Sequence, residues 1–335
     1  MVSAKNVNNM RVAFVGKGGS GKSTVTALFS RYIDQATDKN QWLVDADLNI
    51  NLGKLVDIDE LSQEHHLSSI NSRNIIKKYL IGNNNLIKSP DHLKKTTPPT
   101  AKSGFFNFSN KSNLLFTNFS INKNNTYLSV VGTYQGSGIG TSCYHNNLSI
   151  LENILSHSID LDSYIVVDMV AGIDAFAGSL HSQFDVLVFV VEPTIKSVDV
   201  FGQYLRLATE AKVDQRVYVV GNKIRGTDDR DFILENVPKN KIIGFLPDSD
   251  HIRRVDKGAE KLSFKKLEDD SKSVFNEIEI ILETKKVPPR QRLEHLYDLH
   301  RKYVAQSYVK DRFGDLTEQI DESFDIENYI KQYEI

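Results

Sequence analysis

Short runs of Val, Ile and Leu recur along the chain, and segments with helical spacing of apolar residues lie between them. Most runs are apolar at every position, which is typical of strands covered by helices on both faces of a parallel sheet. The predicted strands are Arg11–Val15, Trp42–Asp45, Tyr127–Val131, Tyr164–Asp168, Val186–Val191, Arg216–Gly221 and Lys241–Leu246. The predicted helices between them are Lys22–Thr37, Ser149–Ser158, Ser197–Lys212 and Asp229–Asn236.

This alternation predicts an α/β fold with a doubly wound, mostly parallel sheet over residues 10–265. Ligands of such sheets bind at the carboxyl ends of the strands. The functional residues are therefore expected just after the apolar runs.

Two segments depart from the alternation. Residues 57–126 are polar and uneven, with seven Asn between Asn107 and Asn125 and a Thr-Thr-Pro-Pro stretch at 96–99. They predict an irregular insertion with a short helix near Asn74–Leu80 and a flexible middle, or else a disordered loop. Residues 266–335 predict a helical extension, broken at Pro288-Pro289, whose apolar stripes need a partner surface.

Composition narrows the class of protein. The 335 residues carry 41 basic and 43 acidic side chains, so we expect no general attraction to nucleic acid or to a membrane surface. The single cysteine, Cys143, allows no disulfide within the chain. The first ten residues lack the apolar core of a signal peptide, and no apolar run is long enough to span a membrane. We expect a cytoplasmic protein.

The first predicted strand leads into a glycine-rich loop. Residues 16–24 read Gly-Lys-Gly-Gly-Ser-Gly-Lys-Ser-Thr, which satisfies G-x-x-x-x-G-K-[ST] before a helix. Glycines let the chain curl so that backbone N–H groups converge on phosphates, while the Lys22 ammonium reaches the β- and γ-phosphates. The Ser23 hydroxyl suits Mg²⁺, which prefers oxygen ligands. A chance match has odds on the order of one in a hundred. Phosphate contacts are predicted for Gly18, Gly19, Ser20, Gly21, Lys22, Ser23 and Thr24.

Carboxylates follow two of the predicted strands. Asp45 and Asp47 end the second strand, where they are well placed for Mg²⁺ or water chemistry; the alternative is that both cap a helix. Asp168 ends an apolar strand and is followed by Gly172, a pattern that predicts a water-mediated Mg²⁺ contact and a segment that senses the γ-phosphate.

A further strand ends in Gly221-Asn222-Lys223, where an Asn can hydrogen bond to a purine edge. Proteins that select guanine place an Asp two residues after the lysine, but here that residue is Arg225, which cannot accept a hydrogen bond. We therefore predict ATP as the nucleotide, with Asn222 and Pro247 near its base.

The loop, with a second lysine at Lys17, resembles the deviant Walker A motif of the MinD, ParA, nitrogenase iron protein and arsenite-pump ATPase superfamily. The resemblance implies a homodimer formed on ATP binding, in which Lys17 reaches the partner's nucleotide. It also implies that Asp47 positions the attacking water and that Asp45 lies near the metal. A solvated surface lysine is the alternative for Lys17.

A narrower resemblance covers residues 10–262. The segments VDADLNINL, VVDMVAGIDAF, VVEPTIKSVD, YVVGNKIR and IIGFLPDSDHI are similar to the carbon monoxide dehydrogenase maturation ATPases. That family carries a C-x-C motif, and two chains together bind a metal through four thiolates. Here Thr141 replaces the first cysteine and Cys143 matches the second, so four thiolates cannot assemble. Two hypotheses follow: a Cys₂His₂ site from Cys143 and His145 of both chains, or a buried or interface cysteine, which we favour.

The resemblance implies a slow, Mg²⁺-dependent ATPase that acts as a nucleotide-driven switch on a protein client, as in metallocluster maturation. The alternatives are a positioning or partition ATPase, and a nucleotide-gated scaffold that binds a protein through its helical tail. The acidic stretch Leu316–Ile335 argues against a membrane anchor.

Overall fold

The computed structural model describes residues 9–59, 61–133, 145–159 and 161–333. Its main feature is an eight-stranded sheet in the order β10-β9-β8-β1-β7-β2-β5-β4, in which only the pair β4 and β5 is antiparallel. Two short parallel strands, β3 and β6, form a second sheet. The strands are β1 (Asn9–Gly16), β2 (Asn40–Ala46), β3 (Phe106–Asn107), β4 (Ile121–Lys123), β5 (Thr126–Val130), β6 (Ser158–Ile159), β7 (Ser163–Met169), β8 (Val186–Val191), β9 (Val217–Ile224) and β10 (Ile242–Pro247).

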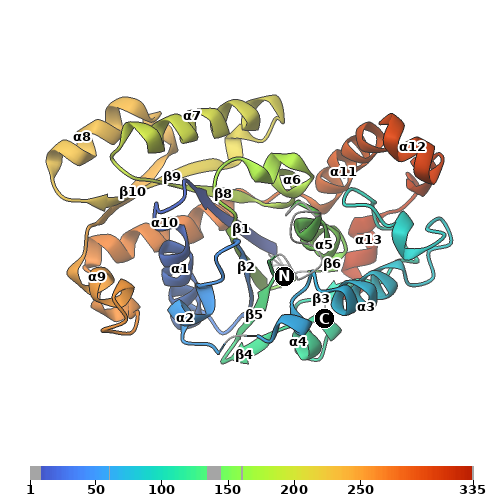
Figure 1. Ribbon diagram of the computed structural model, residues 1–335, viewed down its shortest axis with the longest axis horizontal. Helices are drawn as coiled ribbons and strands as arrows, with labels where there is room; N and C mark the ends of the chain where they lie inside the picture. Colours follow the sequence, from blue (N-terminus) through green and yellow to red (C-terminus); the bar gives the residue numbers. More distant parts are fainter. Residues whose placement is uncertain (1–8, 60, 134–144, 160, 334–335) are drawn as a thin grey trace, which may run out of the picture.

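Helices cover both faces of the large sheet (Figure 1), so the prediction of a doubly wound α/β fold is confirmed. Each of the seven predicted strands corresponds to a strand of this sheet, with ends that differ by at most three residues. The helices are α1 (Lys22–Ala36), α2 (Leu52–Val56), α3 (Ile70–Ile81), α4 (Leu114–Asn118), α5 (His145–Ser156), α6 (Leu180–Gln183), α7 (Ile195–Glu210), α8 (Thr227–Asn236), α9 (Asp250–Asp256), α10 (Asp269–Thr284), α11 (Pro289–Val304), α12 (Ser307–Phe313) and α13 (Ile326–Lys331).

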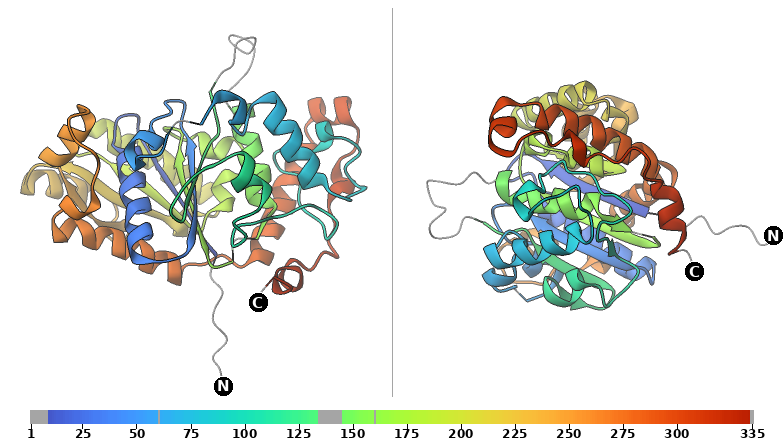
Figure 2. Two further views of the ribbon diagram at one scale, coloured as in Figure 1. Left: turned by 90° about the horizontal axis from the view of Figure 1, so that it is seen from below. Right: turned by 90° about the vertical axis from the view of Figure 1, so that its right-hand side faces the viewer.

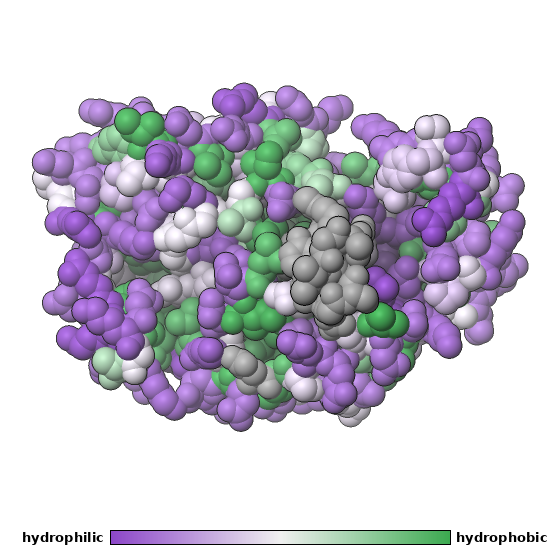
Figure 3. All heavy atoms as spheres, viewed as in Figure 1, coloured by the Kyte–Doolittle hydropathy of each residue, from purple (hydrophilic) through white to green (hydrophobic). Residues whose placement is uncertain are grey.

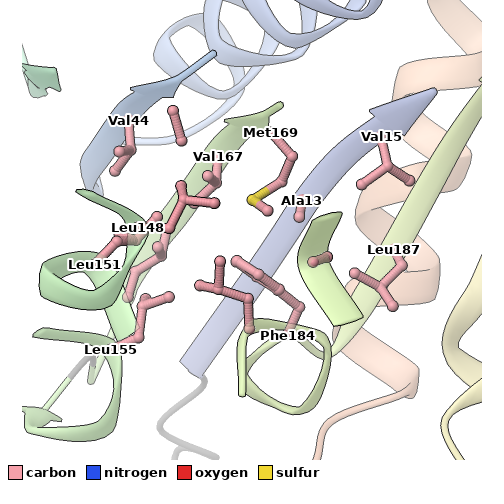
Figure 4. Close-up of a cluster of buried hydrophobic side chains, with 14 of the residues drawn as sticks. Ala13, Val15, Val44, Leu148, Leu151, Leu155, Val167, Met169, Phe184 and Leu187 are labelled. Atoms are coloured by element: carbon pink, nitrogen blue, oxygen red, sulfur yellow. The ribbon is translucent and has the colours of Figure 1, made fainter. Parts of the chain in front are cut away.

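Alternate residues of the central strands pack into two separate layers. Along β1, Ala13 and Val15 belong to the layer under α5 and α7, whereas Val12 and Phe14 belong to the layer under α1 and α10. Figure 4 shows the first layer, where side chains from β1, β2, β7 and β8 meet leucines of α5. Burial on both faces explains why these strands read as continuous apolar runs.

The insertion differs from what we expected. We predicted a flexible middle for residues 57–126, but Thr96 to Thr100 are buried, and four phenylalanines of the segment join the core layer that includes Trp42. The helix predicted at Asn74–Leu80 exists and is longer, Ile70–Ile81. The polar composition suggested flexibility, but many of the Asn and Ser residues form turns around buried aromatic residues. These aromatic residues are Phe106, Phe108, Phe116 and Phe119.

The helical extension finds its partner surface within the chain. α10 packs on the large sheet through Val274, Phe275 and Ile278. α11 to α13 lie beside the insertion (Figures 1 and 2), where Leu293 and Tyr297 pack with Phe105. The predicted break at Pro288-Pro289 is confirmed, since α11 begins at Pro289.

Two buried polar contacts fasten this extension. Arg292 of α11 donates to Asp185 at 2.7 Å, and Asp185 also accepts from the backbone N–H groups of Arg11 and Val287. His300 bonds to Thr96 of the insertion and to the carbonyl of Leu316, both at 3.0 Å. No helix in the described part of the chain is long and apolar enough to cross a membrane.

Candidate nucleotide site

The glycine-rich loop connects β1 to α1 at the carboxyl edge of the sheet. Gly21 precedes the helix with φ 91°, a left-handed conformation that favours glycine. A Cβ on Gly21 would also lie 2.3 Å from Nδ2 of Asn222, so a larger residue does not fit. The first turn of α1 thus presents free backbone N–H groups and the positive end of its dipole at the loop.

A cavity of about 920 Å³ lies beside the loop. Its wall includes six of the seven residues predicted to contact phosphate and extends past α2 to α9. The exception is Ser20, which is buried. The predicted base residues Asn222 and Pro247 line the same cavity. The loop residues on the wall are Gly18, Gly19, Gly21, Lys22, Ser23 and Thr24.

Lys22 is held by carboxylates from two neighbouring strands. Its Nζ lies 2.8 Å from Oδ2 of Asp47, which follows β2, and 4.0 Å from Oδ1 of Asp168 in β7. Burial lowers the pKa of Lys22, but the charges of Asp168, Asp47 and Asp45 outweigh it, so the pKa is raised and the side chain stays an ammonium.

Asp45 has a structural role in this arrangement. Its Oδ2 accepts hydrogen bonds from the backbone N–H groups of Asn51 and Leu52 at the start of α2, and its Oδ1 accepts from the N–H of Asp47. This is the helix-capping alternative that the sequence left open for Asp45. Asp47 does not cap α2; its side chain lines the cavity. A metal contact by Asp45 stays a prediction.

Asp168 lies beneath the cavity wall. The strand register places it beside Asp45, and it is 1% exposed. Burial raises the pKa of Asp168, and the nearby Lys22 and hydrogen bonds from Ser23 and Thr26 partly offset that effect. Burial, followed by the charge of Asp168, also raises the pKa of Asp45.

These oxygens fit Mg²⁺. Mg²⁺ is usually bound through one or two carboxylates together with substrate phosphates, and the Ser23 hydroxyl and Asp168 are already hydrogen bonded at the end of the loop. Across the described residues, no group of three or more His, Cys, Asp or Glu side chains is arranged to hold a metal ion. The proposed Cys143 site lies outside the described residues.

The segment after β7 contacts the loop directly. Gly172 has φ 85°, and its N–H donates to the carbonyl of Gly16 at 3.0 Å. The sequence predicts that Gly172 lets a backbone N–H of this segment approach the γ-phosphate. In this structure the Gly172 N–H bonds to the loop backbone, so a phosphate contact requires the segment to move.

The predicted base-binding region is held by ion pairs. Asn222 lies within β9 and donates from Nδ2 to the carbonyl of Ser20 at 2.8 Å. Arg225 donates from Nε to Oδ2 of Asp248 at 2.7 Å, and Arg253 donates to both oxygens of the same carboxylate. Hydrogen bonds from Arg253 and then Arg225 lower the pKa of Asp248 to about 2.

Sequence reasoning missed two residues beside the loop. Lys223 donates to the carbonyl of Gly19 at 2.6 Å and lies 2.7 Å from Oε1 of Glu192, the residue after β8. Oε2 of Glu192 lies 3.5 Å from Nζ of Lys17. The signal was present, because Glu192 is a carboxylate at the end of a buried strand, as Asp168 is.

The fold and the loop together define a P-loop nucleotide-binding protein. The profile of the CobQ/CobB/MinD/ParA nucleotide binding domain matches residues 12–262. The chain belongs to this family.

Two curated relatives match most of the chain. One is an uncharacterized ATP-binding protein of Methanocaldococcus jannaschii, 25% identical over 255 residues, which are 76% of this chain and 94% of that protein. Another is the carbon monoxide dehydrogenase accessory protein CooC of Rhodospirillum rubrum, 25% identical over 254 residues, 74% of this chain and 87% of that protein.

Solved structures agree on the fold. A ParA family ATPase from Chlorobium tepidum matches with a TM-score of 0.57 and 19% identity, covering 82% of this chain and 98% of that one. A putative plasmid partition protein from Borrelia burgdorferi, bound to AMPPNP, matches with a TM-score of 0.51 and 15% identity, covering 83% and 100%.

Proposed function

We propose that this chain is a Mg²⁺-dependent ATPase that acts as a homodimeric, nucleotide-driven switch. The observation that carries the proposal is the position of Lys22 between Asp47 and Asp168, at the wall of a cavity large enough for a nucleotide. The ammonium is oriented before a nucleotide arrives. Binding exchanges its carboxylate partners for phosphate oxygens.

In this proposal hydrolysis is an in-line attack of water on the γ-phosphoryl group. Backbone N–H groups of the loop and Lys22 bear the developing charge. Ser23, and Asp168 through a water, would hold Mg²⁺, which would supply positive charge to offset that of the phosphates. Asp47, released from Lys22, orients the water. Asp45 fixes the backbone of Asp47 and Asn51, and so keeps Asp47 at the cavity wall.

ATP is favoured over GTP by the state of Asp248. This carboxylate faces the cavity and could accept from guanine, but Arg225 and Arg253 already use both of its oxygens. Guanine donors would therefore have to compete with two arginines for this carboxylate. The family of ATP-binding relatives supports the same choice.

The dimer and the role of Lys17 follow from the deviant Walker A loop. Lys17 is not on the cavity wall; a third of its side chain is exposed, and it points to Glu192. The face seen in Figure 1 carries hydrophobic patches among hydrophilic side chains (Figure 3). Ile173 and Ile195, which follow β7 and β8, are among the exposed large apolar residues. We propose that a second copy covers them and receives Lys17.

A role in metallocluster maturation is the biological setting that the CooC relative favours. The scaffold alternative loses its main support, since the apolar stripes of the tail pack on the insertion of the same chain. Metal analysis of the dimer with and without Cys143→Ala tests cargo binding: a lower metal content in the variant supports it, and an equal content excludes it.

Phosphate release tests the enzymatic proposal. Wild type should hydrolyse ATP slowly, and Asp47→Asn should keep nucleotide binding but lose about 10²-fold or more in turnover. Lys302→Ala, an exposed lysine of α11, is the control. Equal turnover of wild type and Asp47→Asn would contradict the assignment of Asp47.

A further inference from the structure

Glu192 lies between two lysines at the rim of the phosphate loop. Its Oε1 is 2.7 Å from Nζ of Lys223 and its Oε2 is 3.5 Å from Nζ of Lys17. The Glu192 side chain is only 15% exposed, whereas the two lysines are 45% and 33% exposed. The carboxylate is therefore the most buried of the three charged groups. Lys17 reaches it from the phosphate loop, and Lys223 reaches it from β9.

The backbone around Glu192 is also held. Its N–H donates to Oγ of Ser197 at 3.0 Å, and its carbonyl accepts from the N–H of Thr194 at 2.7 Å. These bonds tie the end of β8 to the first turn of α7. The backbone from which the carboxylate extends is therefore set by the fold, independently of Lys17.

Among the described residues, Lys17 makes one ion pair and one hydrogen bond with groups of its own chain. Besides Glu192, its Nζ donates to the carbonyl of Gly18 at 3.3 Å. For Lys17 to act on a nucleotide held by another copy, both contacts must break. Lys223 does not face this conflict, because it also donates to the carbonyl of Gly19 and supports the loop where it stands.

We propose that Glu192 is a positioning residue that holds Lys17 in the unassembled subunit and releases it to the partner's nucleotide. This inference rests on the proposed function, in which Lys17 acts across a dimer. The phosphates of ATP carry more negative charge than one carboxylate, so they outcompete Glu192 only once the second copy is in place. Glu192 thereby opposes assembly without nucleotide and sets the concentration at which assembly occurs.

Removing the charge of Glu192 should therefore favour the dimer. The ion pair is partly exposed, and such pairs contribute little, so Glu192→Gln should lower the dimer dissociation constant about two- to fivefold. The change should depend on Lys17, because the restraint acts through that side chain.

Sedimentation velocity over a range of protein concentrations, with Mg²⁺ and AMPPNP, measures the effect. Four proteins are compared: wild type, Glu192→Gln, Lys17→Ala and the double variant. Glu210→Gln, the same change at the exposed last residue of α7, is the matched control and should behave as wild type. We expect tighter assembly for Glu192→Gln and no difference between Lys17→Ala and the double variant.

Four outcomes overturn the inference. If Glu192→Gln assembles no more tightly than wild type, Glu192 does not restrain Lys17. If the substitution has the same effect with and without Lys17, it acts through Lys223 and the loop. If Lys17→Ala assembles as well as wild type, Lys17 contributes nothing across the dimer and has no restraint to lose. If wild type itself stays monomeric with AMPPNP, the dimer of the proposed function fails and the inference fails with it.

Discussion

Lys22 Nζ and Asp47 Oδ2 lie 2.8 Å apart, which joins the phosphate-binding ammonium to the carboxylate that we assign to the attacking water. Both side chains are almost buried, at 6% and 12% exposed. One residue therefore neutralises the other until phosphate arrives. This exchange couples nucleotide binding to the release of Asp47.

Mixing two inactive variants tests whether Lys17 acts across the dimer. Lys17→Ala and Asp47→Asn should each lose turnover. In a mixed dimer, one of the two sites combines an intact Asp47 with Lys17 from the other copy. Phosphate release by an equal mixture should return to about a quarter of wild type, because half of the dimers are mixed and one site in each is complete. No recovery on mixing would indicate that Lys17 acts within its own subunit.

Nucleotide competition tests the base site. Because Asp248 is hydrogen bonded to Arg225 and Arg253, displacing a fluorescent ADP analogue should require an about 10²-fold higher concentration of GTP than of ATP. Arg225→Ala frees one acceptor of Asp248 and should narrow that ratio. Arg254→Ala, which removes an exposed partner of Glu260, is the control. Equal competition by GTP and ATP for wild type would refute the base assignment.

The buried pair of Arg292 and Asp185 should be a main anchor of the helical extension. Arg292→Ala removes the cationic partner of the buried Asp185 carboxylate, and we expect the free energy of unfolding to fall by about 3 kcal/mol. Urea denaturation measures the loss, and limited proteolysis should cut the released segment near Val287. Lys302→Ala on the same helix should change stability by less than about 0.5 kcal/mol. Similar losses for both variants would show that the pair is not an anchor.

Acid should weaken the contact between the insertion and the extension. Burial lowers the pKa of His300 from 6.5 to about 4. The unfolded chain therefore binds more protons between these values. The stabilisation is complete above the unfolded pKa and is lost as pH falls from about 6.5 toward 4, amounting to about 2 kcal/mol between about pH 7 and about pH 5.

Unfolding free energies of wild type and His300→Gln at those two pH values isolate this contribution. The wild type should lose about 2 kcal/mol more than the variant on acidification, since Gln does not titrate. His157 and His181 are also buried, with pKa values lowered to about 4, and they act equally in both proteins. A pH dependence that is the same in both proteins would mean that His300 does not titrate in this range.

The sheet and the loop could be predicted because their residues are dictated locally. A strand covered on both faces must be apolar throughout, as Val186–Val191 is. A phosphate cradle needs glycines and lysine at fixed spacing, so Lys22 and Ser23 were found from sequence alone. The boundary of β9 was less accurate, since pairing with β10 extends the strand to Ile224 and places Asn222 inside it.

The remaining features depend on contacts between distant residues. Thr96 and His300 are 204 positions apart, and Asp185 and Arg292 are 107 apart. The local sequence around one residue of each pair does not indicate its distant partner. The packing of the insertion against the C-terminal helices therefore could not be predicted. Glu192 could be recognised in the sequence as a carboxylate at a strand end, but its contacts with Lys17 and Lys223 depend on the fold.

Isothermal titration calorimetry of ATP with Mg²⁺ tests the central claim most directly. We predict saturable binding to wild type at one site per chain and the loss of at least about 10² in affinity for Lys22→Ala, whereas Lys302→Ala binds as wild type does. The absence of any saturable heat with wild type, or equal binding by Lys22→Ala, would contradict the assignment of this cavity as a nucleotide site.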